Sequence, residues 1–145
     1  MSDTLKVCGL TIERGTKLRT YLPVPDTNVK IPLTIINGEK DGPTLLITAG
    51  IHGGEYPGIA AAMELGRDIE PEHVIGCLIM MHPVNIQGFW ARREMIVPED
   101  GKNLNRVFPG DPMGTLADKT AYLISNNFFS IADFYVDMHS GDIHE

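Results

Sequence analysis

The pattern of apolar and polar residues divides the chain into a β-rich first third and a remainder in which apolar strands alternate with helical segments. Thr16–Val24 and Val29–Asn37 are rich in residues that favour strands, and Pro23, Pro25 and Asp26 between them are typical of a turn. These two segments are therefore predicted to form a hairpin, whose strands run antiparallel.

Three apolar runs follow along the chain. After a second turn expected at Gly38–Pro43, Thr44–Ala49 and Val74–Met81 are almost continuously apolar. Runs of this kind are typical of strands that are buried on both faces of a sheet. Phe134–Met138 predicts a third, shorter strand, which is apolar enough for an interior position but is expected to have an unpaired outer edge in residues 1–145.

Two segments between these strands carry helix signals. Pro57 stands at an expected first helical position, and Ile59–Ile69 has helical composition and spacing. Thr115 and Asp118 match the pattern of a capping box, which predicts a second helix from there to about Phe129.

The segment of about Pro83–Met113 shows neither a strand pattern nor a helical pattern, and it holds many polar residues. An irregular segment this long is uncommon unless it is functional. The order of elements predicts an α/β fold, with a mixed β-sheet and flanking helices, and 145 residues fit one domain. In open sheets of this kind, binding sites lie beyond the carboxyl ends of the strands.

A histidine follows each of the three apolar strands. His52 and Glu55 follow the first in a glycine-rich turn and could face one cation, although each also suits a purely structural role at the start of a helix. His82 follows the second strand and His139 the third. Two imidazoles and one carboxylate would leave a fourth position for water, as in catalytic zinc sites. Asp137 faces the same way as His139 on a strand, so it either orients that imidazole or pairs elsewhere.

A second candidate group lies in the loop Asp100–Gly110. Asn105 and Arg106 stand side by side and offer amide donors with a planar guanidinium, which suits a carboxylate bound through both oxygens. The density of asparagine, glycine and proline in this loop also fits a purely structural role for both residues.

Charge and composition exclude several classes of function. The net charge of −7 argues against a nucleic-acid backbone or an anionic membrane surface as partner. No apolar run approaches the ~20 residues that a membrane span needs. Cys8 and Cys77 form no CxxC pattern, which favours two reduced cysteines in a cytoplasmic protein.

Four stretches, in this order, resemble the succinylglutamate desuccinylase/aspartoacylase family, a branch of the zinc carboxypeptidase-like fold. They are Ala49–Gly58, Asn85 with Gly88–Phe89, Asn103–Gly110 and Asp137–Gly141. The resemblance spans the chain in order, and the combination is far more specific than any one motif.

The resemblance implies one Zn²⁺ ion held by His52, Glu55 and His139. It also implies that Asn105 and Arg106 bind a carboxylate of the substrate. No ligand is expected at the other histidines.

An arginine that polarises the scissile carbonyl is implied as well, and Arg93 is preferred over Arg92 for this catalytic role. The function implied is that of a zinc-dependent deacylase, which cleaves the amide bond of an N-acyl amino acid or a similar small N-acyl compound that bears a carboxylate. A homo-oligomer is left open.

One departure from the family concerns the general base, a glutamate that lies well beyond the third zinc ligand. Only six residues follow His139, and neither Asp142 nor Glu145 stands in the context of that base. Residues 1–145 are therefore expected to be the N-terminal part of a deacylase catalytic domain, with the base downstream of Glu145. Two alternatives stay open: a zinc carboxypeptidase that acts on peptides, and a non-catalytic zinc-binding half-domain.

Overall fold

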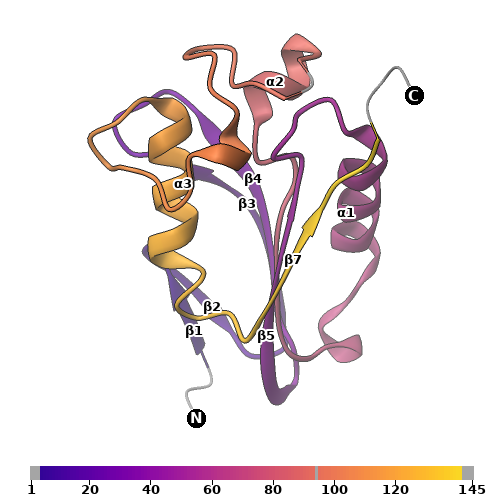
Figure 1. The fold of residues 1–145 in the computed structure, drawn as a ribbon. Helices are drawn as coiled ribbons and strands as arrows, with labels where there is room; N and C mark the ends of the chain where they lie inside the picture. Colours follow the sequence, from indigo (N-terminus) through magenta and orange to yellow (C-terminus); the bar gives the residue numbers. More distant parts are fainter. Residues whose placement is uncertain (1–3, 94, 142–145) are drawn as a thin grey trace.

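A five-stranded sheet forms the centre of the structure, a computed structural model that describes residues 4–93 and 95–141. Its strands are β3 (Thr16–Pro23), β4 (Lys30–Asn37), β5 (Lys40–Ala49), β6 (Ile75–Met81) and β7 (Phe134–Met138). They lie in the order β3-β4-β6-β5-β7; β4 pairs antiparallel with β3 and β6, and β5 pairs parallel with β6 and β7. The sheet is therefore mixed, as expected, and the predicted hairpin is β3 with β4 (Figure 1).

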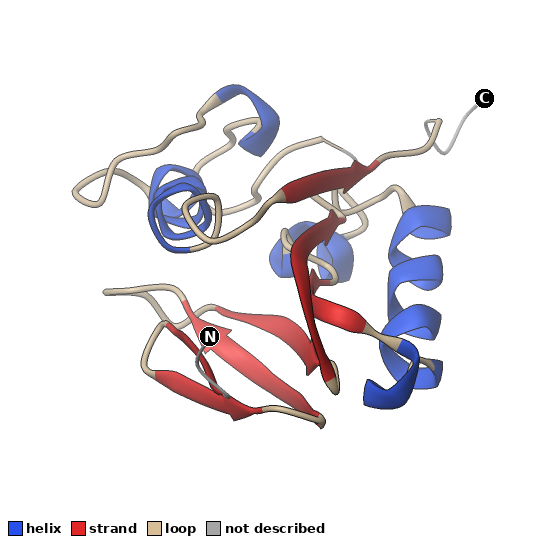
Figure 2. Ribbon diagram, turned by 90° about the horizontal axis from the view of Figure 1, so that it is seen from below, coloured by secondary structure: helices blue, strands red, loops and turns tan. Residues whose placement is uncertain are grey.

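Helices cover both faces of this sheet. The helices are α1 (Tyr56–Asp68), α2 (Ile86–Ala91) and α3 (Leu116–Asn127), with the 3-10 turns η1 (Pro71–His73) and η2 (Leu104–Arg106). Figures 1 and 2 show α1 and α3 on opposite faces, with α2 above one end of the sheet. A separate antiparallel ribbon, β1 (Thr4–Val7) with β2 (Leu10–Glu13), packs into the same core as α3.

The side chains of β4 point alternately to the two faces of the sheet, so this strand contributes to the apolar core on both faces. Leu33 and Ile35 are buried in the main core with α3, whereas Ile36, which points to the opposite face, is buried in a second cluster. Successive side chains of a strand point to opposite faces, so a strand between two helical layers must be apolar on both.

The expected turn at Gly38–Pro43 is wrong, because β5 begins at Lys40. The register between β5 and β6 shifts between Lys40 and Thr44, so the start of the strand is irregular. A Cβ at Gly42 would lie 2.8 Å from the backbone nitrogen of Gly76, so the glycine allows this close approach.

The expected irregular segment Pro83–Met113 is also wrong in part, because it contains α2 and η2. Asn85 stands at the N-cap of α2, where its Oδ1 accepts a hydrogen bond from the Gly88 N–H at 2.9 Å. The capping box of α3 is confirmed, since Asp118 Oδ2 accepts from the backbone N–H of Thr115 at 2.9 Å and from its hydroxyl at 2.8 Å.

Cys8 and Cys77 are unpaired, in agreement with the sequence. Burial raises the pKa of the Cys77 thiol to about 12, so this residue behaves as an apolar core side chain. None of the helices in the described part of the chain has both the length and the apolar character of a membrane span.

Candidate active site

The carboxylate of Glu55 joins the two histidines that follow β5 and β7. Its Oε1 lies 2.8 Å from His52 Nδ1, and its Oε2 lies 2.9 Å from His139 Nδ1. One ligand-capable atom from each residue falls within 4.8 Å of the others, and the two imidazole rings are 5.0 Å apart. The structure thus brings together all three residues that the sequence singles out as metal ligands.

A glycine-rich turn between β5 and α1 positions His52 and Glu55. Gly50 has φ +72°, a backbone conformation that favours glycine, and it ends the strand sharply. A Cβ at Gly53 would lie 2.3 Å from the backbone nitrogen of Phe89, so only glycine lets α2 approach this turn. His52 and Glu55 are consequently buried, with 8% and 9% of their surface exposed.

On the β7 side, a chain of hydrogen bonds holds His139. Asp137 Oδ2 lies 2.7 Å from His139 Nε2, while Asp137 Oδ1 accepts a hydrogen bond from the Thr48 hydroxyl at 2.7 Å. The Tyr135 hydroxyl then donates to Thr48 Oγ1 at 2.8 Å. Burial lowers the pKa of His139, but the carboxylates of Asp137 and Glu55 outweigh it and leave the pKa raised.

On the β5 side, Asn103 holds His52, a contact that the sequence did not reveal. Asn103 Oδ1 lies 3.1 Å from His52 Nε2 and also accepts a hydrogen bond from the Asn105 N–H at 2.9 Å. Since an amide oxygen only accepts, Nε2 of His52 is the donor in this contact, and a metal ion bound at Nδ1 would leave that hydrogen bond in place. Asn103 received no role in the sequence analysis, although this residue opens the Asn103–Gly110 stretch that resembles the family.

The residues predicted to bind substrate lie near this group without contacting it. Asn105 and Arg106 form part of η2 and are tied to His52 through Asn103; Arg106 is exposed and donates to the Asn105 carbonyl at 3.2 Å. Arg93 follows α2, and its backbone N–H donates to the Gly88 carbonyl at 2.9 Å. Its exposed guanidinium forms no hydrogen bond or ion pair within residues 4–93 and 95–141.

An aromatic hollow of about 580 Å³ lies beside the turn and is lined by Tyr56, Phe89, Trp90 and Arg92. The Phe89 ring packs edge-on against Tyr56 and Trp90, at 5.7 Å and 5.1 Å between ring centres. None of His52, Glu55 and His139 lines this hollow, although Tyr56 directly follows Glu55 in the sequence. Asp142, His144 and Glu145, which the sequence analysis weighed, lie outside the described residues.

The donor atoms of the site fit a divalent transition metal. Two imidazole nitrogens and a carboxylate converge, and each imidazole has its second nitrogen held by an acceptor, Asn103 or Asp137. This is the arrangement that fixes the tautomer and ring orientation of metal-binding histidines. The same donors are those that catalytic zinc sites use.

The sequence model of the succinylglutamate desuccinylase/aspartoacylase catalytic domain matches residues 41–144. The chain belongs to this family. It is 40% identical over 128 residues to an N-alpha-acetyl-L-2,4-diaminobutyric acid deacetylase of Halomonas elongata, which covers 83% of this chain and 37% of that protein. The family match agrees with the resemblance that the sequence motifs indicate.

Solved structures of the family share the fold. A succinylglutamate desuccinylase/aspartoacylase from Rhodobacter sphaeroides superposes with a TM-score of 0.83 at 34% identity, over 97% of this chain and 44% of its own. The product-bound ectoine utilization protein EutE (DoeB) from Ruegeria pomeroyi gives 0.84 at 34% identity, with the same coverage. The fold is therefore that of the zinc carboxypeptidase-like proteins, and the chain spans less than half the length of these relatives.

Proposed function

We propose that residues 1–145 are the N-terminal part of the catalytic domain of a zinc-dependent deacylase. The observation that carries this proposal is the Glu55 carboxylate, which lies within 2.9 Å of the Nδ1 atoms of both His52 and His139. Two imidazoles and one carboxylate form the donor set of a catalytic zinc ion, and in such sites a further acceptor holds the second nitrogen of each imidazole.

In this proposal, His52 and His139 bind one Zn²⁺ through Nδ1, and Glu55 binds it through its carboxylate. Bound zinc would supply Lewis acidity toward an amide carbonyl and would lower the pKa of water to near ~7. Asn103 and Asp137 keep the protons on the far nitrogens, so that both Nδ1 lone pairs stay available to the metal.

The substrate class proposed is a small N-acyl compound that bears a carboxylate, such as an N-acyl amino acid. Arg106 is assigned to the carboxylate, because a guanidinium donates two parallel hydrogen bonds to its oxygens, and Asn105 assists. Arg93, whose guanidinium has no partner in the described part of the chain, is assigned to the amide carbonyl. The deacetylase among the relatives favours small N-acyl substrates over the peptides of a carboxypeptidase.

The proposal makes two claims. The first is that a protein of the relatives' length that contains this chain hydrolyses the substrate, and the second is that the 145-residue chain by itself binds the metal. Zinc titration of the metal-free chain by calorimetry tests the second claim, and one zinc per chain is expected. His52→Ala and His139→Ala should each weaken zinc binding at least ~100-fold, whereas His73→Ala, an exposed histidine on η1, should change nothing.

Equal affinities for His52→Ala and His73→Ala would contradict the metal assignment. For the reaction, a protein that contains this chain and reaches the relatives' length should release acetate from an N-acetyl amino acid. Loss of that activity in Arg93→Ala but not in Arg92→Ala would support the choice of Arg93, and the reverse result would transfer the role.

A further inference from the structure

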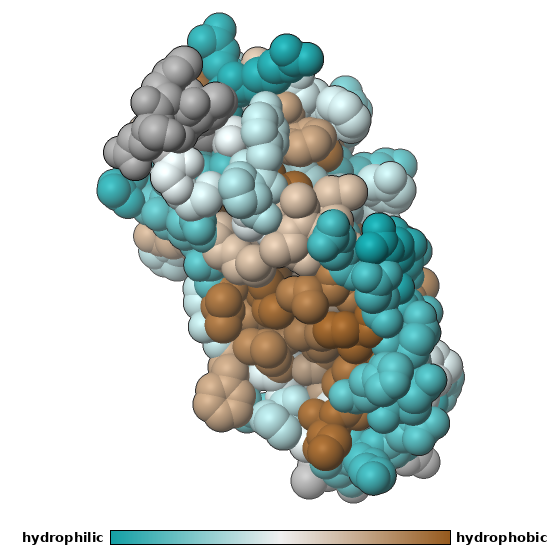
Figure 3. Space-filling model, turned by 90° about the vertical axis from the view of Figure 1, so that its right-hand side faces the viewer, coloured by the Kyte–Doolittle hydropathy of each residue, from teal (hydrophilic) through white to brown (hydrophobic). Residues whose placement is uncertain are grey.

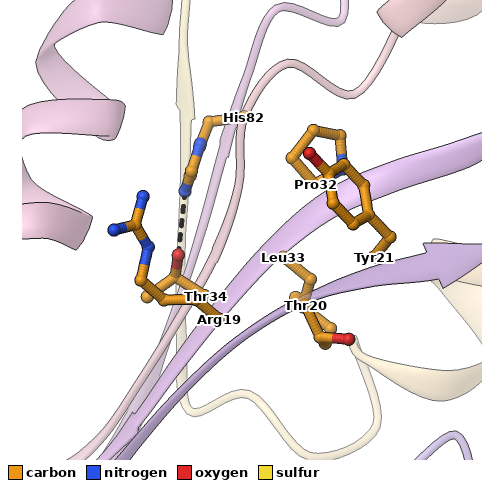
Figure 4. A pocket seen from close by; sticks show the side chains of 7 residues that line it. All are labelled: Arg19, Thr20, Tyr21, Pro32, Leu33, Thr34 and His82. Carbon is orange, nitrogen blue, oxygen red and sulfur yellow. Dashed lines mark hydrogen bonds between the residues drawn. The ribbon is translucent and has the colours of Figure 1, made fainter.

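A hollow of about 420 Å³ opens on the face of the sheet that α1 covers, outside the metal-binding group. Its lining comes from β3, β4 and the end of β6: Arg19, Thr20, Tyr21, Pro32, Leu33, Thr34 and His82 (Figure 4). Neither the proposed zinc ligands nor the proposed substrate-binding residues belong to this lining, so the proposed deacylation does not account for it.

His82 is the least expected residue of this hollow, because only 6% of its surface is exposed. Its Nε2 lies 3.1 Å from the Thr34 hydroxyl, while its Nδ1 is buried and has no hydrogen-bond partner among the residues that the structure describes. Buried polar atoms almost always have hydrogen-bond partners. An apolar side chain at this position would avoid the cost of the unpaired nitrogen, so the imidazole is expected to have a function here.

Within the described residues, the only side-chain hydrogen bond of His82 is the one between its Nε2 and Thr34. Gly66 of α1 sits over this contact, and a Cβ there would lie 3.2 Å from Thr34 Oγ1 and 3.3 Å from His82 Nε2. Burial lowers the pKa of His82, and the nearby Arg19 guanidinium adds to this effect. A neutral imidazole that donates from Nε2 to Thr34 leaves the proton of the Thr34 hydroxyl free to point elsewhere.

Arg19 supplies the positive charge of the hollow. Its guanidinium is exposed and forms no ion pair or hydrogen bond with the residues that the structure describes, whereas the neighbouring Lys17 is paired with Glu70 at 2.8 Å. Figure 4 shows the guanidinium beside Thr34 and His82, with the rings of Tyr21 and Pro32 at the other end of the hollow. An unpaired guanidinium next to an oriented hydroxyl is the chemistry that binds a carboxylate.

We propose that this hollow is a second binding site, specific for a small monocarboxylate. Arg19 donates two hydrogen bonds to the carboxylate, and the Thr34 hydroxyl donates a third, while His82 orients that hydroxyl. The aliphatic part of the ligand lies against Tyr21 and Pro32. A single guanidinium in a chain of net charge −7 matches one negative charge and disfavours a dianion such as phosphate.

The test is a titration of the ¹⁵N-labelled, zinc-free chain with sodium butyrate, followed by NMR at pH 7 and constant ionic strength. Saturable shifts are expected at the Thr34 amide and at the His82 imidazole nitrogens, at millimolar butyrate and at higher acetate concentrations. Arg19→Gln should weaken binding at least tenfold. The control Lys119→Gln removes the same charge from α3, on the opposite face of the sheet, and should leave the affinity unchanged.

Two further variants separate the roles of the lining residues. Arg19→Lys keeps the charge but loses the planar pair of donors, so weaker binding than in the original chain is expected. Thr34→Ser keeps the hydroxyl and should retain binding together with the His82 shifts.

The absence of saturable shifts at Thr34 and His82, or equal affinities in Arg19→Gln and Lys119→Gln, would overturn the proposal. Phosphate that binds as tightly as butyrate would overturn the monocarboxylate specificity. Because zinc is absent throughout, these outcomes do not depend on the metal site.

Discussion

Asp137 Oδ2 lies 2.7 Å from His139 Nε2, on the side of the imidazole away from Glu55. Glu55 Oε2 lies 2.9 Å from His139 Nδ1, so both ring nitrogens face a carboxylate. With a metal ion bound at Nδ1, the proton of His139 would lie on Nε2, where Asp137 accepts it. Asn103 does the same for His52 at 3.1 Å. Two different side chains thus provide an acceptor for the far nitrogen of each histidine.

The first prediction concerns Asp137. Asp137→Asn should lower the zinc affinity of the chain about 10–100-fold, because an amide orients the imidazole less strongly and makes it less basic. Calorimetric titration with zinc measures this. Asp26→Asn, the same change in an exposed turn, is the control and should bind zinc as the original chain does.

A result in which Asp137→Asn keeps full zinc affinity while His139→Ala loses it would show that Asp137 serves only the strand end. Asp137 also accepts a hydrogen bond from Thr48 on the neighbouring strand β5, so it has a structural contact that does not involve His139.

The second prediction concerns Asn103, which links the metal site to the loop of Asn105 and Arg106. Asn103→Ala should weaken zinc binding about 10–100-fold and should also shift the amide resonance of Asn105, because one oxygen accepts from both partners. Asn103→Asp retains an acceptor oxygen and should preserve most of the affinity. If Asn103→Ala and Asn103→Asp lose affinity equally, the oxygen is not what holds His52.

The third prediction tests the carboxylate assigned to Arg106. An N-acetyl amino acid should bind the zinc-loaded chain, and Arg106→Lys should weaken this binding about tenfold, because the charge stays but the planar fork is lost. Titration by NMR checks it through the amide signals of η2. Arg19→Gln is a useful control, since it lies outside this site and should leave these signals unaffected. Identical affinities for Arg106→Lys and the original chain would restrict Arg106 to shaping the loop.

Sequence alone predicted the parts of the fold whose burial leaves a clear apolar pattern, because burial requires apolar residues. Apolar runs identified the central strands, because a strand covered on both faces must be apolar throughout. The ribbon of β1 and β2 was missed, since each strand has only four residues and its burial depends on contacts with the distant α3. Likewise α2, with six residues, is too short to show a helical period.

The apolar run Phe134–Met138 was expected to have an unpaired outer edge, and β7 does lie at the edge of the described sheet. Phe134 and Val136 are 61% and 46% exposed. Composition indicates that a strand is apolar, but it does not say which neighbour covers it.

For the site, residue types and strand ends were sufficient to bring His52, Glu55 and His139 together. The partners behind them were harder to foresee. Asp137 could be proposed from the alternation of a strand, whereas Asn103 reaches His52 across 51 positions of sequence. A contact of that kind is determined by how the loop folds, which no local pattern encodes.

The fourth prediction concerns the start of α3. Lys102 forms an ion pair with Asp118. This ion pair and the hydrogen bonds from Thr115 together hold the pKa of the Asp118 carboxyl below its usual range. Because the folded pKa is depressed, this stabilisation is complete above the pKa of the unfolded chain, ~3.9, and is lost as the pH falls through the lower folded value. Asp118→Asn should therefore destabilise the chain by about 1 kcal/mol at pH 7, and the difference should shrink below pH ~4.

Denaturant unfolding at pH 7 and pH 3 measures this difference. Asp68→Asn removes an exposed ion pair with Arg67 and should leave the unfolding midpoint nearly unchanged at both values. A destabilisation by Asp118→Asn that is independent of pH would mean that the charge of Asp118 does not contribute and that the loss comes from changed hydrogen bonds at Oδ2.

The last prediction concerns the free edge of β7. This strand pairs only with β5 in the described sheet, and Phe134, Tyr135 and Val136 are all exposed. Figure 3 shows a broad apolar patch on the side of the molecule that carries α1 and β7. An apolar hollow of about 500 Å³ adjoins Phe134 and the exposed Ile75.

An unpaired strand edge with exposed apolar side chains offers hydrogen bonds and apolar surface to a second chain. The 145-residue chain is therefore expected to self-associate as its concentration rises, which light scattering coupled to gel filtration measures as an increase in mass. Val136→Lys places a charge on the edge and should shift the chain toward the monomer. Met113→Lys, at a position that is 88% exposed and lies in the turn before α3 rather than on β7, is the matched control and should leave self-association unchanged. A chain that stays monomeric at high concentration, or one whose association responds equally to both lysines, would show that the β7 edge does not drive assembly.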